Sequence, residues 1–240
     1  MAQGQRLKVL CTVFAIACVA ITISLTPSQR VKAEKGGSNG DSRVQIGLEA
    51  APVPLNMEGK NPAQVGLGSY LVNVAGDCNG CHSAGPPTEY APGHNPYQLV
   101  PGSNPPVDQP QQINPATYLG GGRDFGFLGP PSNSNTAHII SRNLTPDSSG
   151  LPEGSTFDQF VAHIRTGVDD DNRHPTCPGP PGTPPNGCVP YPFDGRLLQI
   201  MPWTNFKDMS DQNLRAIYEY LKAVPCIEGN DPYDKPGRCG

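Results

Sequence analysis

The chain has 240 residues, of which 36% are hydrophobic and 16% are charged, and its formal net charge at pH 7 is -4. This composition excludes a fibrous or membrane-embedded protein, and the length allows one ordinary domain with extensions or two small ones. Nucleic acid is not an expected partner, because clustered lysines and arginines are missing. The 28 glycines and 29 prolines indicate few helices and long loops.

The N-terminal segment predicts export. Arg6 and Lys8 form a positive start, residues 9–25 are mostly apolar, and Val31-Lys32-Ala33 offers a small-residue cleavage site. The apolar stretch is longer than in most cleaved signals and approaches the length of a membrane-spanning helix. We therefore expect a periplasmic protein, with a retained N-terminal membrane anchor, or lipidation at Cys18, as the alternatives to a cleaved signal.

Removal of residues 1–33 would take away four basic residues and no acidic one, which changes the formal charge from -4 to -8. The mature protein is therefore expected to be acidic and to favour partners with a basic surface. Export also places the cysteines where disulfides can persist. Six cysteines follow the signal, in the pairs Cys78/Cys81, Cys177/Cys188 and Cys226/Cys239.

Two segments of different character precede the first cysteine pair. Residues 34–60 have no sustained hydrophobic period and contain Gly, Ser and Pro, so they predict a flexible linker. Pro62 suits a first helical turn, and a helix is predicted from there to Gly76. Its apolar side consists of Val65, Tyr70, Leu71 and Val74. This helix leads the chain directly to Cys78.

Two proline-rich and glycine-rich segments, 85–118 and 172–195, are predicted as long insertions. The first contains nine prolines and almost no periodic apolar signal, which indicates an extended excursion over the surface. In the second, a Cys177–Cys188 disulfide would reduce the entropy of the loop. Between them, Ile139 and Ile140 predict a short strand or a buried turn.

Two further helices are predicted from their caps. A capping box at Thr156 and Gln159 opens the first, which ends at Gly167. Ser210 caps the second, and Pro225 stops it. The apolar faces are Phe157, Phe160, Val161 and Ile164 in the first helix and Leu214, Ile217, Leu221 and Val224 in the second. Together these elements predict a mostly helical domain of three or four helices.

The stretch Cys78-Asn79-Gly80-Cys81-His82 carries the strongest chemical signal. A structural zinc site needs four ligands, and no second cysteine pair has a matching short spacing. A thiol-disulfide oxidoreductase motif should follow a strand, whereas a helix precedes this one. Covalent haem attachment needs two thiols that add to the porphyrin vinyl groups and a neighbouring His that reaches the iron. The pattern favours haem, with redox, zinc and a plain disulfide as alternatives.

Met201 is the best sequence candidate for a sixth iron ligand. It lies in the irregular stretch "QIMPWTNF", where Pro202 removes a backbone donor and restricts the chain. Met209 precedes a helix cap and is interpreted as a packing residue, and Met57 lies in the predicted linker. His138 is the substitute ligand if Met201 fails, because His is also a common haem ligand.

Five segments in this order resemble one family: "GSYLVNVAGDCNGCHSAG", "GGRDF", "SRNLTPDSSG", "FVAHIRTG" and "IMPWTNFKDMSDQNLRAIYEYLKAVP". Over residues 61–226 the chain resembles a class I c-type cytochrome of the bacterial, exported, dehydrogenase-associated kind. The resemblance implies a cytochrome c-like fold around one covalently attached haem c per chain. It implies attachment at Cys78 and Cys81, ligation by His82 and Met201, and a turn at Asn143 that packs beside the haem.

Other residues have weaker interpretations. Arg123 is a candidate partner for a haem propionate and Trp203 for the haem flank, each against the alternative of an ordinary surface or core residue. His163 and His174 are expected to be surface or boundary residues. Residues 169–171, three consecutive aspartates, predict a solvated acidic turn.

The expected function is electron transfer rather than catalysis, with one haem that alternates between its ferric and ferrous states. An upstream dehydrogenase and a downstream cytochrome or oxidase are the expected partners. The alternatives are a haem subunit of a catalytic dehydrogenase complex, a five-coordinate haem enzyme, or a disulfide-linked module in which Cys78 and Cys81 pair. Cys177–Cys188 and Cys226–Cys239 are the expected disulfides because each closes a short loop rich in turn residues. Residues 227–240 are expected to form a C-terminal tail.

Overall fold

The computed structural model describes residues 40–85, 88–127, 138–169, 194–234 and 236–240. The predicted signal or anchor over 1–33 and the predicted Cys177–Cys188 disulfide lie outside these residues. Among the helices of the described ranges, none is both long enough and apolar enough to cross a membrane.

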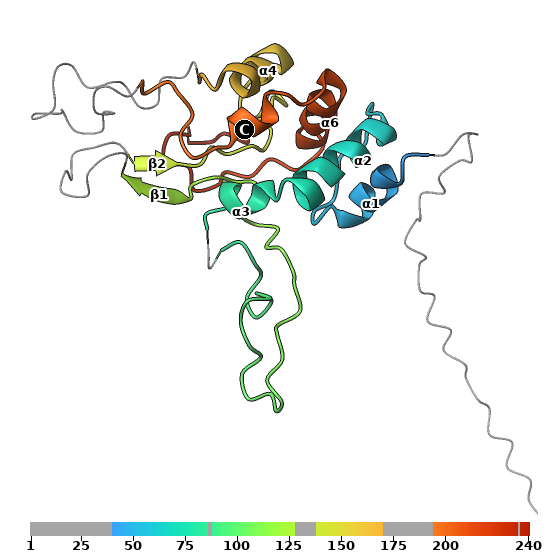
Figure 1. Ribbon diagram of the computed structural model, residues 1–240, viewed down its shortest axis with the longest axis vertical. Helices are drawn as coiled ribbons and strands as arrows, with labels where there is room; N and C mark the ends of the chain where they lie inside the picture. The colour runs from blue at the N-terminus through green and yellow to red at the C-terminus, as the bar shows by residue number, and fades with distance from the viewer. Residues whose placement is uncertain (1–39, 86–87, 128–137, 170–193, 235) are drawn as a thin grey trace, which may run out of the picture. The chain divides into compact units, whose positions relative to one another are not determined.

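Helices provide most of the regular structure (Figure 1). In chain order the elements are α1 (Ser42–Ala50), α2 (Pro62–Ser69), the π-helix η1 (Tyr70–Ala75), α3 (Cys78–His82), β1 (Asp124–Phe127), β2 (His138–Ile140), α4 (Phe157–Thr166), α5 (Trp203–Phe206) and α6 (Asp211–Leu221). The helices predicted after Pro62, Thr156 and Ser210 are confirmed as α2 with η1, α4 and α6. Helices α1, α3 and α5 were not predicted.

Helix α1 corrects the prediction of a flexible linker over 34–60 for the residues that it spans, while residues 34–39 lie outside the described ranges. The Asp41 carboxylate accepts a hydrogen bond from the backbone N–H of Arg43 and caps the helix. The buried Gly47 faces α2 so closely that a Cβ added to it would lie 1.9 Å from the carbonyl oxygen of Gly66. The helix is therefore held by a glycine-to-glycine backbone contact. Val44 and Leu48 add partly buried apolar contacts, but they do not form a long apolar stripe that the sequence pattern would reveal.

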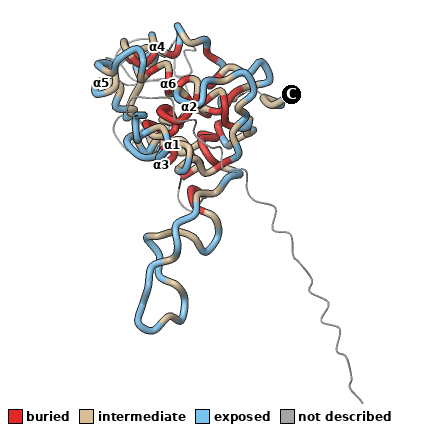
Figure 2. Tube along the Cα trace, turned by 90° about the vertical axis from the view of Figure 1, so that its right-hand side faces the viewer, coloured by how far each residue is buried: buried red, intermediate tan, exposed pale blue. Residues whose placement is uncertain are grey.

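The core lies where α2, η1 and α6 pack together, and it is seen as the buried interior in Figure 2. Gly68 of α2 packs against Ala216 and Tyr220 of α6. Tyr220 and Tyr118 are buried, and their hydroxyl oxygens lie 2.7 Å apart. Asn73 of η1 donates to the Tyr220 hydroxyl and accepts from the Tyr118 hydroxyl. These contacts satisfy the buried polar atoms and join the N-terminal helices to the C-terminal one.

The chain changes direction between η1 and α3. In the π-helix, the backbone N–H of Gly76 donates to Leu71, five residues earlier, at 2.9 Å. Such π-turns occur often at functional sites. Asp77 then adopts the left-handed conformation, with φ +44°, before α3 begins at Cys78. The turn starts the cysteine-containing helix on a new axis.

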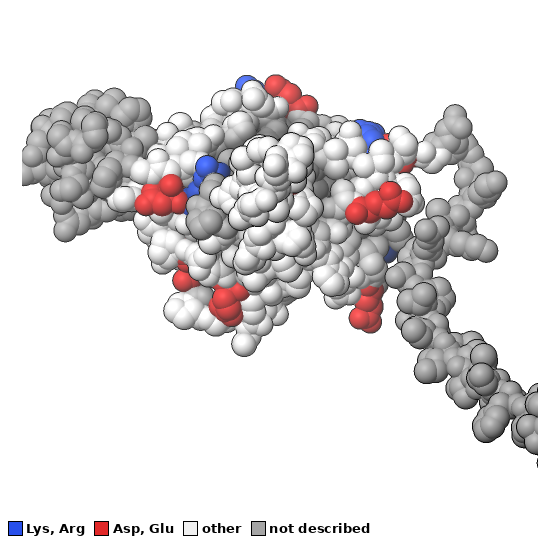
Figure 3. All heavy atoms as spheres, turned by 90° about the horizontal axis from the view of Figure 1, so that it is seen from below, with Lys and Arg blue, Asp and Glu red and all other residues white. Residues whose placement is uncertain are grey.

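The two insertions and the small sheet are only partly described. Strands β1 and β2 are antiparallel, with Asp124 opposite Ile140 and Phe127 opposite His138. Of the two alternatives predicted for Ile139 and Ile140, a short strand or a buried turn, the strand is confirmed. Residues 88–117 fold back on themselves through isolated bridges between Tyr90 and Ile113 and between Leu99 and Asp108. This segment contains no Lys or Arg. Figure 3 shows a largely uncharged centre with acidic groups towards its edges and few basic groups.

The segment 227–240, which the sequence predicted as a C-terminal tail, packs on the loop that contains Asn143. The predicted Cys226–Cys239 disulfide is present, with its Cα atoms 5.6 Å apart. Arg238 donates to the backbone carbonyl of Thr145 at 2.5 Å. Asp231 is buried. The short spacing of the cysteines predicted the disulfide, but only the tertiary contacts define what this segment packs against.

Candidate functional site

An apolar cavity of about 280 Å³ lies between η1, α3, β2, α4, α6 and the loop that precedes α5. Its walls include Leu71 from η1, Phe160 and Ile164 from α4, and Leu214, Ile217 and Leu221 from α6. The last five residues belong to the apolar stripes predicted on the two capped helices. Those stripes therefore face a shared cavity as well as the core. The cavity walls are suited to a largely apolar ligand.

Helix α3 brings Cys78, Cys81 and His82 to this cavity. The position between the cysteines is restricted, since a Cβ added to Gly80 would lie 2.9 Å from the Asp77 carboxylate. Both cysteines are free thiols, so the structure does not contain the disulfide of the alternative hypothesis. Burial, reinforced by the negative charge of Asp77 and by Cys81, raises the pKa of the Cys78 thiol to about 12. Cys78 is therefore a neutral thiol at physiological pH.

The orientation of His82 is set by a backbone carbonyl. Its Nδ1 lies 2.7 Å from the carbonyl oxygen of Arg142. Because a carbonyl only accepts, Nδ1 carries the proton, and Nε2 of the neutral ring keeps its lone pair. Burial lowers the pKa of His82, and the hydrogen bond to Arg142 opposes this only in part. The imidazole is thus neutral and in the tautomer that ligating histidines adopt.

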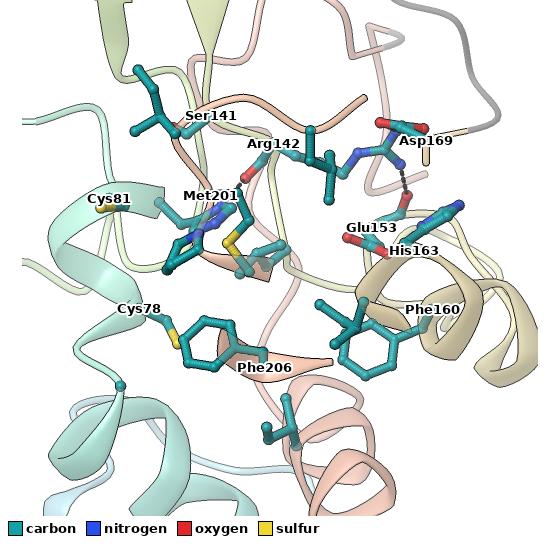
Figure 4. Close-up of a pocket in the computed structure, with 18 of the residues that line it drawn as sticks. Cys78, Cys81, Ser141, Arg142, Glu153, Phe160, His163, Asp169, Met201 and Phe206 are labelled. Carbon is teal, nitrogen blue, oxygen red and sulfur yellow. Dashed lines mark hydrogen bonds and ion pairs between the residues drawn. The ribbon is translucent and has the colours of Figure 1, made fainter. Parts of the chain in front are cut away.

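Met201 borders the same cavity from the loop before α5 (Figure 4). Its backbone is held by two tight turns. The N–H of Met201 donates to Gln199 at 2.6 Å, and the N–H of Trp203 donates to Met201 at 2.8 Å. Ile200 has a φ of +64°, which is rare for a β-branched residue. These turns fix the backbone of Met201 at the cavity wall.

A charged cluster forms another part of the cavity wall and was missed in the sequence (Figure 4). Arg142 pairs with Asp169 at 2.6 Å, and the Nδ1 of His163 lies 3.3 Å from the Glu153 carboxylate. All four side chains are nearly buried. His163, predicted at the surface or boundary, is buried, and Asp169, predicted in a solvated acidic turn, is nearly buried, so both predictions are wrong for these side chains; the other two aspartates of that turn lie outside the described residues. The available signal was the position of His163, three residues after Phe160 on the apolar face of α4.

The protonation states of this cluster follow from its geometry. Burial would raise the pKa of Glu153, but the hydrogen bond to His163 and the charge of Arg142 outweigh it, so the pKa is lowered. The hydrogen bond to Glu153 raises the pKa of His163, against the opposing effect of burial. The pair therefore favours a carboxylate facing an imidazolium.

Four other sequence candidates are not among the described residues that line the cavity. Arg123 donates to the carbonyl of Gly80 and lies over the ring of Phe125. Trp203 packs on the helix end at Gly167, where an added Cβ would lie 2.3 Å from the indole. Arg123 and Trp203 thus support the elements that carry the site, and do not themselves reach the cavity.

The other two are Asn143 and His138. Asn143 is fully buried within its loop. Its Nδ2 donates to the carbonyl of Ile227, and its Oδ1 accepts from the Thr145 hydroxyl. The Nδ1 of His138 lies 2.7 Å from Asp124, outside the cavity. His138 would have to leave this partner to reach a ligand in the cavity.

Comparison of the chain with models of protein families, with curated proteins and with solved structures finds no match. Within the described ranges, no three His, Cys, Asp or Glu side chains converge as a metal site would require. A function for this chain is therefore inferred from the cavity and the residues around it.

Proposed function

We propose that this protein is a c-type cytochrome that holds one haem in the apolar cavity. The observation that carries the proposal is the convergence of His82 and Met201 on this cavity from distant parts of the chain. His82 has its Nδ1 proton engaged by Arg142, which leaves Nε2 as the ligating atom. A thioether on another wall is the second ligand of a His/Met pair.

The residues present fit a covalently attached haem. Cys78 and Cys81 lie one helical turn apart on α3, which allows both sulfurs to reach one edge of a porphyrin. The aliphatic and aromatic walls would shield such a group from water. Cys81 is exposed, so the attachment edge would lie near the protein surface. Electrons could then enter and leave at this edge.

We propose electron transfer as the function. When bound, the haem supplies one-electron chemistry, and a Met ligand with apolar surroundings favours the ferrous state. The chain holds both ligands so that little rearranges, through Arg142 at His82 and through the tight turns at Met201. The acidic composition suits a partner with a basic surface in the periplasm, and an upstream dehydrogenase and a downstream cytochrome or oxidase are proposed in these roles.

The first test is a reduced-minus-oxidised visible spectrum of protein made in a host that attaches haem, compared with Met201→Ala. Met209→Ala is the matched control, because Met209 borders the same cavity. We expect a c-type α band and a weak near-infrared sulfur-to-iron band that disappears in Met201→Ala and persists in Met209→Ala.

Three outcomes would contradict the proposal. A colourless protein would show that no haem is attached and would favour a disulfide or a zinc site at Cys78 and Cys81. If Met201→Ala leaves the haem spectrum unchanged, another residue is the sixth ligand. Ready binding of cyanide or carbon monoxide to the unmodified protein at neutral pH would favour the five-coordinate enzyme.

A further inference from the structure

The peptide group between Arg142 and Asn143 is hydrogen-bonded to two side chains, those of His82 and Asp231. The carbonyl oxygen of Arg142 accepts from His82 Nδ1 at 2.7 Å, and the adjoining N–H of Asn143 donates to Asp231 Oδ2 at 3.2 Å. Both groups belong to the same planar amide, so their relative orientation is fixed. The imidazole of His82 and the carboxylate of Asp231 are therefore joined through a single rigid unit.

This peptide group is held firmly in place. Asn143 is fully buried, and its side-chain Nδ2 donates to the Ile227 carbonyl at 2.8 Å. Its Oδ1 accepts from the backbone N–H of Thr145 at 3.0 Å. On the other side, Gly121 approaches so closely that an added Cβ would lie 2.4 Å from the Asn143 nitrogen. The amide is thus shielded from water and cannot rotate away from its two partners.

The connection has an electrostatic consequence. A carboxylate that accepts from an amide N–H draws the proton towards itself and increases the electron density on the carbonyl oxygen of the same amide. The carbonyl of Arg142 then accepts more strongly from His82, which makes the imidazole a better electron donor at Nε2. Because Asp231 is buried, solvent screens this effect only weakly.

We propose that Asp231 is a positioning residue for His82, and that it acts through the 142–143 peptide to make His82 a stronger ligand. The proposal rests on the haem function proposed above. A more electron-rich imidazole stabilises ferric iron more than ferrous iron, so Asp231 lowers the reduction potential. The segment closed by Cys226 and Cys239 would thereby tune the haem, although none of its described residues lines the cavity.

Asp231→Asn tests this in the full chain with haem attached. Glu228→Gln is the control, since it removes an equal charge from the same segment, and its carboxylate bonds to the backbone of Arg238 and Cys239 instead. We expect Asp231→Asn to favour the ferrous state about tenfold, which is about 59 mV for a one-electron couple. Glu228→Gln should give less than a third of this shift. Asp231→Glu, which keeps the charge, should stay near the unmodified protein.

Nitrogen NMR of the His82 ring separates the hydrogen bond from a general charge effect. In the reduced haem protein, the Nδ1 proton should shift to the position of a weaker hydrogen bond in Asp231→Asn and stay unchanged in Glu228→Gln. Equal potentials in Asp231→Asn and Glu228→Gln, or an unchanged Nδ1 proton in Asp231→Asn, would overturn the proposal. A colourless protein would instead refute the haem function, and the His82 ring spectrum of that protein would still decide whether Asp231 polarises the imidazole.

Discussion

Gly68 of α2 and Ala216 of α6 meet backbone to backbone, because a Cβ added to Gly68 would lie 1.9 Å from the Ala216 carbonyl oxygen. This crossing brings η1 and α6 close enough to form two walls of the cavity. The site therefore depends on the absence of one side chain at a position far from its chemistry.

Gly68→Ala should separate the two helices, since the nearest atoms belong to backbone and cannot rotate away. We expect a loss of about 3 kcal/mol in the free energy of unfolding, measured by denaturant titration. Gly40→Ala is the control, because nothing lies within 4 Å of its added Cβ. Equal stability of the two variants would show that α2 and α6 do not cross in this way.

Replacing Ile200 by a residue that adopts a positive φ more easily should stabilise the protein. Its φ of +64° costs a β-branched residue about 1 to 2 kcal/mol, and the residue is 55% exposed, so little burial is lost on replacement. We expect Ile200→Asn to raise the free energy of unfolding by about 1 kcal/mol in thermal denaturation. Ile200→Val keeps the strain and should give no gain. A lower stability of Ile200→Asn would contradict the positive φ of Ile200 in the turn before Met201.

The Glu153 and His163 pair should stabilise the fold in a defined pH window. The raised pKa of His163 means that its contribution is complete below the ordinary value of 6.5 and is lost as pH rises through the folded value. The lowered pKa of Glu153 means that its contribution is present above 4.5 and is lost as pH falls through the folded value. The pair is therefore strongest between about pH 4.5 and 6.5.

Glu153→Gln should cost about 2 kcal/mol inside this window and less outside it, as measured by urea denaturation across pH. The control is Glu219→Gln, whose partners Arg215 and Lys222 lie 3.9 Å away on the helix surface. It should cost less than about 0.5 kcal/mol. A cost for Glu153→Gln that grows steadily above pH 7 would contradict the assigned protonation states.

The Cys226–Cys239 disulfide should stabilise the segment that contacts Asn143. Its cysteines are 13 residues apart, and a loop of this size corresponds to about 3 kcal/mol of chain entropy. We expect the double variant Cys226→Ser, Cys239→Ser to lose about that much in denaturant titration. Non-reducing peptide mapping should recover this pair. A Cys177–Cys226 link would disprove it, while the Cys177–Cys188 pairing stays a prediction.

Local signals in the sequence were sufficient for several elements. The capping box of Thr156 and Gln159 and the cap at Ser210 predicted where α4 and α6 begin. Each cap joins groups within three residues, so no distant contact is needed to form it. Asp41 caps α1 in the same local way, but the sequence shows no clear apolar period there, because the buried position on this helix is Gly47, which packs against Gly66 of α2.

The sequence by itself determined which residues form one compact group: the two thiols and the imidazole lie within five consecutive positions, and their chemistry depends on that spacing. Only the tertiary structure decided what surrounds them. The carbonyl of Arg142 at His82, the partner of His163 and the carboxylate of Asp231 come from segments far apart in the chain. Sequence periodicity reports which face of an element is apolar, whereas such polar contacts depend on how distant loops pack, and no local pattern encodes them.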